Sequence, residues 1–305
     1  MSSIEPAEQG GTGRKPGFPG LEDAPLILDG GFATQLESRG HDLSGELWSA
    51  QLLLSEPAEI VAAHRDFFDA GAQVATTASY QLSREGLGRV GRADDFESLL
   101  RLSVDLAREA AGEEDLVAAS VGPYGAMLAD GSEYRGDYGL SVAQLAQWHR
   151  PRLEILAEAG AEVLAIETVP NAAEAEALLA LVAELGVPAW LSLSVAEGRT
   201  RAGEELTEIF RAAGEVENLV AVGINCSSAA GLAPVLSQAV AVSGKPAIAY
   251  PNSGEDWLAD AREWSGEGRF DAAGAQSWVN AGARWVGGCC RVGPALIAEV
   301  ARAVG

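Results

Sequence analysis

Three cysteines are the residues of this sequence best suited to chemistry. Cys226 lies in the stretch GINCSS, and Cys289 and Cys290 stand side by side in WVGGCCRVG, with no other cysteine in the chain. Adjacent cysteines make a strained disulfide, and three is an odd number, so a secreted disulfide framework is not expected. Soft thiolates select Zn²⁺, which takes about four tetrahedral ligands, so three protein thiolates would leave one position open for a reacting group.

The elements that would bring these cysteines together repeat along the chain. Short apolar runs rich in β-branched residues each end in a turn of Gly, Pro, Ser or Asn, and an amphipathic stretch follows. Eight such runs are predicted as strands, at residues 25–31, 73–80, 116–125, 162–170, 188–195, 219–228, 246–254 and 284–292. They are nearly continuously apolar, which is typical of parallel strands covered by helices on both faces. Eight βα units, with no G-x-G-x-x-G turn after the first strand, predict an α/β fold of the (β/α)8 TIM barrel type.

In such a barrel the reactive groups lie at the C-terminal ends of the strands. Cys226 ends the sixth predicted strand, and Cys289 and Cys290 end the eighth. Neighbouring side chains of a strand point to opposite faces, so the adjacent pair cannot both serve the core. We expect Gly287 and Gly288 to free the backbone so that both thiols turn to one ion. The sequence therefore predicts a zinc site at the C-terminal mouth of the barrel.

Polar residues at other strand ends are candidates for substrate binding. Glu167 ends the apolar run VLAIE, and burial without a partner would be costly, so a cationic substrate group or a backbone network should meet it. Asp29 ends the first strand, where it could contact substrate or cap its own turn. Glu255, Trp257 and Tyr250 near the seventh strand could form an anionic and aromatic wall for a cation, or could serve only packing and solvation.

Composition and the chain ends exclude several classes of protein. The 305 residues carry a formal net charge of -23, which disfavours nucleic acid and anionic membranes as partners. No apolar run reaches the length of a membrane span, and no signal peptide is visible, so a cytoplasmic protein is expected. Residues 1–20 are rich in Gly, Pro and charge and are predicted to be a disordered tail, followed by one catalytic barrel domain over residues 21–305. The oligomeric state is left open, and a monomer is compatible with the sequence.

Several motifs resemble those of the homocysteine S-methyltransferases, from about Leu26 to the C-terminus. The stretches are LDGGFATQLE, TTASYQLS, SVGPYGAMLADGSEY, ETVPNAAEAEAL, GINCSS, YPNSGE and GGCCR. YPNSGE is most similar to the branch that uses S-methylmethionine or S-adenosylmethionine. The resemblance implies transfer of a methyl group from such a sulfonium donor to the zinc-bound thiolate of L-homocysteine, which forms methionine, with one Zn²⁺ per chain held by Cys226, Cys289 and Cys290.

The resemblance also implies roles for other residues. Glu167 matches the carboxylate that receives the homocysteine amino group, and Tyr80 falls where an aromatic hydroxyl approaches the site. Thr168 departs from the betaine-dependent enzymes, which have a tyrosine there, so zinc ligation at this position is not implied. The predicted substrate-binding residues are Asp29, Gly30, Gly31, Tyr80, Glu167, Asn252 and Glu255.

Two other functions stay open at this level. The vicinal pair Cys289 and Cys290 could serve a thiol oxidoreductase, although it lacks the C-x-x-C spacing of common dithiol motifs. A zinc-binding barrel without catalytic activity would show the same cysteines. No H-E-x-x-H, G-x-S-x-G or G-x-x-x-x-G-K-[ST] motif occurs, which disfavours zinc protease, serine hydrolase and nucleotide hydrolase functions.

Overall fold

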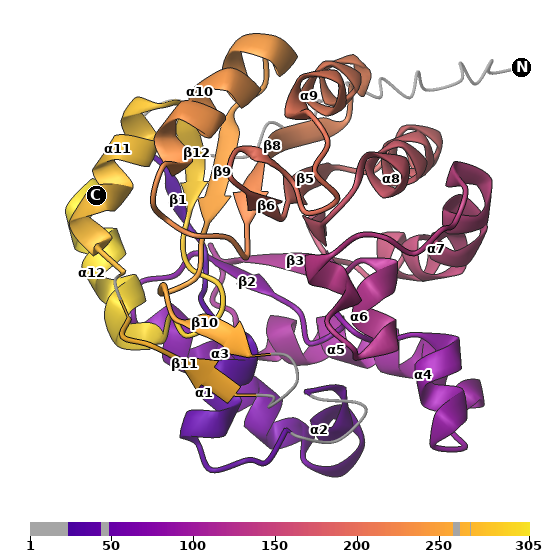
Figure 1. The fold of residues 1–305 in the computed structure, drawn as a ribbon. Helices are drawn as coiled ribbons and strands as arrows, with labels where there is room; N and C mark the ends of the chain where they lie inside the picture. Colours follow the sequence, from indigo (N-terminus) through magenta and orange to yellow (C-terminus); the bar gives the residue numbers. More distant parts are fainter. Residues whose placement is uncertain (1–23, 44–48, 259–262, 269) are drawn as a thin grey trace, which may run out of the picture.

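The structure, a computed structural model, describes residues 24–43, 49–258, 263–268 and 270–305. The predicted tail at residues 1–20 lies outside these ranges. Eight parallel strands of the described chain form one sheet in the order β1-β12-β9-β8-β5-β4-β3-β2, and a parallel bridge between Leu28 and Val74 joins its two ends. Helices surround these strands in Figure 1. The prediction of a (β/α)8 barrel is therefore confirmed.

Each predicted strand contains an observed one, but the observed strands are shorter. They are β1 (Leu26–Ile27), β2 (Val74–Thr76), β3 (Leu116–Val121), β4 (Val163–Val169), β5 (Ala189–Leu193), β8 (Leu219–Asn225), β9 (Ala247–Tyr250) and β12 (Ala283–Val286). The residues that the prediction assigned to the C-terminal ends of strands mostly belong to the loops that follow. This matters for function, because those loops carry the cysteines and their neighbours.

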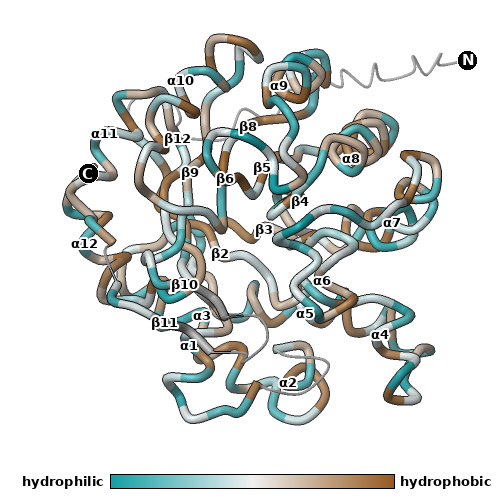
Figure 2. The backbone as a smooth tube through the Cα atoms, viewed as in Figure 1, coloured by the Kyte–Doolittle hydropathy of each residue, from teal (hydrophilic) through white to brown (hydrophobic). Residues whose placement is uncertain are grey.

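The described chain contains helices that surround the barrel and short helices in the loops. They are α1 (Phe32–Ser38), α2 (Ala50–Ser55), α3 (Pro57–Asp69), α4 (Arg84–Arg89), α5 (Phe96–Ala110), α6 (Tyr124–Leu128), α7 (Val142–Ala157), α8 (Ala172–Leu185), α9 (Leu206–Glu215), α10 (Leu232–Ser243), α11 (Ala275–Asn280) and α12 (Pro294–Val304), with short 3₁₀ turns η1 (Ala93–Asp95), η2 (Ser132–Tyr134) and η3 (Ala272–Gly274). Figure 2 shows hydrophobic and hydrophilic positions mixed along helices such as α7 and α9, as expected when one helix face packs on a barrel. No helix in the described ranges is long and apolar enough to cross a membrane.

Local sequence sets several helix boundaries. Ser141 and Gln144 form a capping box at the start of α7. The Asn171 side chain accepts a hydrogen bond from the Glu174 backbone at the start of α8, and that helix ends at Gly186, whose φ is +67°. Such caps satisfy backbone groups that the helix itself leaves unpaired, so they fix where the βα and αβ loops begin.

Two antiparallel pairs beyond the barrel were not predicted. One is β6 (Val195–Ala196) with β7 (Arg199–Thr200), and the other is β10 (Asp256–Leu258) with β11 (Glu263–Ser265). Glu197 and Gly198 link the first pair, with φ of +51° and +76°, as a type I′ turn requires. Arg201 directly follows this hairpin, and its guanidinium contacts the Cys226 carbonyl oxygen and the Tyr134 ring.

Aromatic side chains fill the barrel interior below the mouth. Trp190 and Trp285 are fully buried, with ring centroids 5.5 Å apart. The Trp190 indole donates to the Tyr250 hydroxyl over 3.1 Å, and that hydroxyl lies 2.5 Å from Ser192 Oγ. These large side chains fill the barrel axis, so it offers no open pore and the site has a packed floor.

We expect Trp190→Ala to lower the free energy of unfolding by about 3–5 kcal/mol, because it would leave a large cavity in a packed core. Urea denaturation measures this. Val90→Ala is the matched control: Val90 is 43% exposed and should change stability by less than about 0.5 kcal/mol. Equal losses in the two variants would contradict a packed interior.

Candidate metal and substrate site

The three cysteine sulfurs lie together at the mouth of the barrel. Cys226 follows β8 directly, and Cys289 and Cys290 follow β12, with β9 between these two strands. Cys226 Sγ is 3.7 Å from Cys290 Sγ, which is 3.9 Å from Cys289 Sγ, and all three atoms lie within 4.8 Å of one another. A tetrahedron of sulfur ligands 2.3 Å from zinc has edges of about 3.8 Å. The sulfur positions therefore fit a tetrahedral metal ion.

The protonation of these thiols is shared among them. Hydrogen bonds from Cys289 and Cys290 hold the pKa of Cys226 well below its ordinary value. Because those two thiols donate to Cys226, their own pKa values are raised well above the ordinary range, with burial adding to the effect. When no cation is near, ionisation of one thiol thus disfavours ionisation of the other two. A divalent cation would remove this conflict, since it favours the thiolate form of each ligand.

Non-glycine residues of the site adopt left-handed backbone. The φ angles are +46° at Cys226, +61° at Thr168 and +66° at Arg291. Such conformations cost about 1–3 kcal/mol each and persist only where the surrounding structure imposes them. A positive φ is especially unusual at Thr168, because this residue is β-branched. The pairing of β4 with β5 also shifts register here, between Ile166 and Val169. The strained backbone therefore lies at Cys226 and directly after Glu167, the predicted substrate-binding carboxylate.

The glycine pairs beside the site act through their small size. A Cβ on Gly30 would lie 2.1 Å from the Val292 carbonyl oxygen, and one on Gly288 would lie 2.2 Å from Val292 Cγ1. A Cβ on Gly287 would lie 2.6 Å from Leu28 Cβ, just after β1, and the Gly31 amide donates to the Val292 carbonyl oxygen. None of the four glycines has a positive φ. The expectation that Gly287 and Gly288 supply backbone freedom was therefore wrong, because close packing of the β1 and β12 loops requires them.

A cavity of about 120 Å³ lies over the thiols. Its lining includes the carboxylates of Asp29, Glu133 and Glu167, the rings of Phe32, Tyr80, Tyr134 and Tyr250, and all three cysteines. Among the described residues that line it, none is a lysine, arginine or histidine. A larger cavity, of about 400 Å³, lies between α4, α5 and α7 and contains none of the thiols. The smaller one therefore combines the metal ligands with a strong excess of acidic groups.

Glu167 lies in β4 and is only 8% exposed. Ser120 Oγ donates to its Oε1, and among the described side chains it forms no ion pair. Burial raises the pKa of Glu167 to about 7, against the lowering effect of Ser120 and Tyr250. Part of the expected polar network is thus present, and the carboxylate still lacks a cationic partner. A substrate ammonium group would supply it.

Asn225 holds the strained segment that carries Glu167. Its Oδ1 accepts from the Thr168 amide over 2.7 Å and from Ser192 Oγ over 2.9 Å. Its Nδ2 donates to Thr168 Oγ1 over 2.8 Å. Asn225 directly precedes Cys226, so one residue pair links the strained turn of β4 to the first metal ligand. No pattern in the sequence indicated this role of Asn225.

We expect Asn225→Ala to lower the free energy of unfolding by about 1–3 kcal/mol, because the buried Thr168 amide loses its acceptor. Zinc content should fall as well, since the neighbouring Cys226 turn loses its support. Asn218→Ala is the matched control, because the Asn218 side chain bonds backbone carbonyls of Val182 and Val187, at the opposite end of the strands. It should lose stability and keep its metal, as judged by denaturation and metal analysis. A full metal content in Asn225→Ala would contradict the link.

Asp29 bridges two strands. Its carboxylate accepts from the Thr76 amide over 2.8 Å and from Thr76 Oγ1 over 3.0 Å, while the residue lines the cavity. Burial raises the pKa of Asp29 well above its usual range, and the Thr76 bonds oppose this shift. The carboxylate therefore joins the loop after β1 to β2. Its contact with substrate stays a prediction.

The predicted residues of the seventh strand end lie beside the cysteine turn. Asn252 Oδ1 accepts from the Cys290 amide over 3.2 Å. Glu255 accepts from Ser253 Oγ and lies 3.4 Å from Arg291 Nε. Neither Asn252 nor Glu255 lines the cavity, and their contact with substrate stays a prediction. Trp257 lies in β10, and its side chain is outside what the structure describes.

Sequence reasoning missed three residues around the cavity: Glu133, Tyr134 and Arg201. Tyr134 Oη is 3.3 Å from Cys226 Sγ, although 92 positions separate them in sequence. The Arg201 guanidinium lies 5.4 Å from the centre of the Tyr134 ring and donates to the Cys226 carbonyl oxygen over 3.1 Å. Glu133 precedes Tyr134 in the SEY stretch, which the resemblance included without a role for either residue. No local pattern marks such contacts between distant loops.

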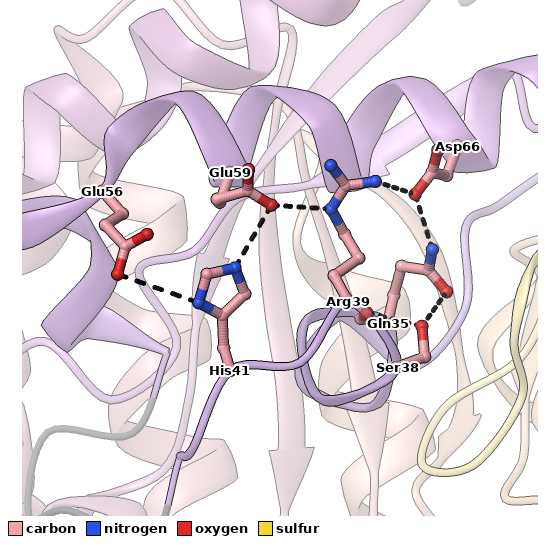
Figure 3. A network of polar contacts seen from close by, with 7 residues as sticks. All are labelled: Gln35, Ser38, Arg39, His41, Glu56, Glu59 and Asp66. Carbon is pink, nitrogen blue, oxygen red and sulfur yellow. Dashed lines mark hydrogen bonds and ion pairs between the residues drawn. The ribbon is translucent and has the colours of Figure 1, made fainter.

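None of the three histidines lines the cavity. His41 lies between Glu56 and Glu59, and Arg39 joins Glu59 to Asp66 in the network of Figure 3. This network ties the end of α1 and the loop that follows it to α3. His64 and His149 are buried in α3 and α7. General acid or base chemistry by histidine is therefore not indicated at this site.

Known proteins resemble the chain over almost its entire length. A family model described as homocysteine S-methyltransferase matches residues 26–304. The chain is 41% identical over 299 residues to Homocysteine S-methyltransferase YbgG of Bacillus subtilis, covering 92% of this chain and 95% of that protein. It is 40% identical over 301 residues to Selenocysteine Se-methyltransferase of Brassica oleracea var. italica, covering 90% and 87%. The metallated crystal structure of the homocysteine methyltransferase MmuM from Escherichia coli matches with a TM-score of 0.81 and 39% identity, covering 92% and 97%. The matched range contains every strand of the barrel and all three cysteines.

Proposed function

The chain belongs to the homocysteine S-methyltransferase family, and on this premise we propose a zinc-dependent transfer from a sulfonium donor to homocysteine. The chain is a methyltransferase that acts on small molecules, and homocysteine methylation is the activity that its relatives support. Our proposal adds three features to this activity: the metal, the residues that bind substrate and the methyl donor. The observation that carries the proposal is the set of three sulfurs spaced 3.7 and 3.9 Å apart over a cavity rich in carboxylates.

We propose that Cys226, Cys289 and Cys290 hold the zinc ion. The sulfur spacings match the edges of a tetrahedral zinc site, and the conflict among the three thiol pKa values favours a bound cation. When bound, zinc would lower the pKa of the homocysteine thiol, so that the acceptor sulfur is a thiolate at neutral pH. Tyr134 and Arg201 support the Cys226 ligand from outside the cluster, through its sulfur and its carbonyl oxygen.

Glu167 is the proposed partner of the homocysteine ammonium group. Its carboxylate lines the cavity that holds the thiols, with Ser120 fixing one oxygen. The strained backbone at Thr168, clamped by Asn225, sets the direction of this carboxylate. Two points, sulfur and ammonium, would then fix the acceptor relative to the donor. Such positioning of two reactants can lower a barrier by about 7–11 kcal/mol in favourable cases.

In the methyl transfer, a negatively charged thiolate reacts with a positively charged sulfonium. A lone pair of the homocysteine thiolate forms a bond to the methyl carbon, and the bond from that carbon to the donor sulfur breaks. Its electron pair stays on the donor sulfur, which becomes a neutral thioether. Because both charges are neutralised as the methyl group moves, a cavity that excludes water favours the transition state over the separated ions. The packed tryptophans below the thiols close the cavity on that side.

S-methylmethionine is the donor that we favour over S-adenosylmethionine. The cavity of about 120 Å³ offers room for small aliphatic groups, and a nucleoside would have to extend beyond it. S-methylmethionine carries its charge on a compact dimethylsulfonium group. The preference for S-methylmethionine is therefore proposed from size, while the YPNSGE motif indicates a sulfonium donor of either kind.

The test measures zinc content and methyl transfer on one preparation, with homocysteine and each sulfonium donor in turn. We expect about one zinc per chain and faster methionine formation from S-methylmethionine. Protein that holds zinc and transfers no methyl group would overturn the proposal in favour of a non-catalytic barrel. Folded, metal-free protein that turns over thiol and disulfide substrates would support the oxidoreductase alternative instead.

A further inference from the structure

Glu133 is a buried acid with one carboxylate oxygen that no described group meets. It lies in η2 after β3, lines the cavity over the thiols and is 6% exposed. Its Oε2 atom is buried and has no hydrogen-bond partner among the described groups. Leaving a buried carboxylate oxygen unpaired is costly, so a group absent from the free protein should meet it. The residue therefore has the properties of a binding site that awaits a ligand.

The other two acids of the cavity differ from Glu133 in this respect. Asp29 accepts from the amide and hydroxyl of Thr76, and Glu167 accepts from Ser120. The basic residue nearest to Glu133 in sequence, Arg135, pairs instead with Asp130 and Asp137. No described residue that lines the cavity is basic, so within the cavity a counter-charge for Glu133 would come from a ligand. That ligand group should be a cation.

On the basis of the proposed function, we infer that Glu133 binds the sulfonium group of the methyl donor. Four cationic groups would come to this site during the reaction: the metal ion, the homocysteine ammonium group, the donor's own ammonium group and the sulfonium. The cysteines and Glu167 are assigned to the first two. Glu133 lines one cavity with the thiols and with Tyr134, whose hydroxyl lies 3.3 Å from Cys226 Sγ. Of the two cationic groups of the donor, only the sulfonium has to approach the thiols for methyl transfer.

The chemistry of a sulfonium fits these surroundings. It has no N–H or O–H bond to donate, so a site recognises it through charge and through aromatic faces rather than by hydrogen bonds. Tyr80 and Tyr134 line the cavity with Glu133, and the Tyr134 ring already meets one cation, the Arg201 guanidinium, at 5.4 Å. Burial raises the pKa of Glu133 to about 7, against the lowering effect of its backbone hydrogen bond and of Arg135. A nearby sulfonium would favour the ionised form.

The experiment compares two ligands that differ only in charge. S-methylmethionine and 2-amino-5-methylhexanoate have the same shape, with a sulfonium in the first replaced by a neutral CH in the second. Their affinities for the zinc-loaded full chain are measured by calorimetry, and homocysteine affinity is measured separately. We expect the parent to prefer the sulfonium by about tenfold or more, and Glu133→Gln to reduce that ratio to near one. Zinc content and homocysteine affinity should not change.

Two further variants serve as controls for Glu133→Gln. Glu176→Gln removes the same charge from an exposed position of α8, and the ratio should survive there. Glu133→Asp keeps the charge but draws it back by one methylene, and part of the ratio should return. This variant also separates a loss of charge from a loss of folding.

Three outcomes would overturn the inference. The ratio could persist in Glu133→Gln, could disappear in Glu255→Gln instead, or the homocysteine affinity could fall while the donor affinity holds. The proposed function fails separately, when the zinc-loaded parent makes no methionine from either donor. Binding needs no turnover, so the ratio still tests Glu133 in that case.

Discussion

Cys290→Ala is expected to remove both the bound zinc and methyl transfer. Cys290 is the sulfur common to the two short contacts, at 3.7 Å from Cys226 and 3.9 Å from Cys289. Without it, two thiolates cannot complete a stable tetrahedral site. Loss of residues that merely support a metal ligand typically costs 10–100-fold in affinity, so loss of the ligand itself should cost more than about 100-fold. Metal analysis and a competition titration with a chelating dye measure this, alongside methionine formation.

The control for this variant changes a polar residue of a neighbouring turn. Ser228 is exposed two positions after Cys226, and its Oγ accepts only from the nearby Ala230 amide among the hydrogen bonds of the described residues. Ser228→Ala should keep its zinc and its activity. Full activity in Cys290→Ala after exhaustive metal removal would show that the thiol cluster is not the site of chemistry.

Glu167→Gln is expected to raise the KM for homocysteine by about 100-fold, because a buried charge-assisted contact to the ammonium group is lost. The pH dependence gives a second readout. Burial raises the pKa of Glu167 to about 7, so its ionised fraction grows as pH rises through neutrality. The parent's kcat/KM for homocysteine should therefore rise more steeply between about pH 6 and 8 than that of the variant.

The effect of Glu167 on the free energy of unfolding should change with pH in the direction opposite to that of kcat/KM. A carboxyl group whose folded pKa lies above its unfolded value binds more protons in the folded state between those two values. The contribution of Glu167 to the parent's stability therefore falls as pH rises from about 4.5 to about 7, and Glu167→Gln removes that contribution. At pH 8 the variant should be at least as stable as the parent by urea denaturation. A variant that loses stability and activity together would point to a structural role only.

Glu162→Gln is the matched control for Glu167→Gln. Glu162 lies just before the other end of β4, where it pairs with Arg108 and accepts from the Val117 amide. Its replacement should leave the homocysteine KM unchanged. A comparable rise in KM would mean that the change at Glu167 acts through the strand rather than through the substrate.

The sequence by itself determined the barrel and the convergence of the cysteines. Each apolar run and each helical period is a local pattern, and eight alternating units allow few other folds. Because parallel strands place their C-terminal ends at one mouth, Cys226 and Cys289 could be brought together without knowledge of any contact. The same rule placed Asp29, Tyr80 and Glu167 at that mouth, and the structure puts all three in the lining of the cavity.

The tertiary structure alone decided how the site is held and where its charges are unmet. The left-handed Thr168, its clamp by Asn225, and the contact of Tyr134 with Cys226 join loops that are 57 and 92 positions apart. The lack of room for a Cβ at Gly30, and the lack of a partner for Glu133, likewise depend on what other loops bring close. Strand patterns arise from interactions repeated every few residues, so they can be read locally. Loop conformations and the partners of buried polar atoms depend on single contacts between distant segments, which no local pattern records.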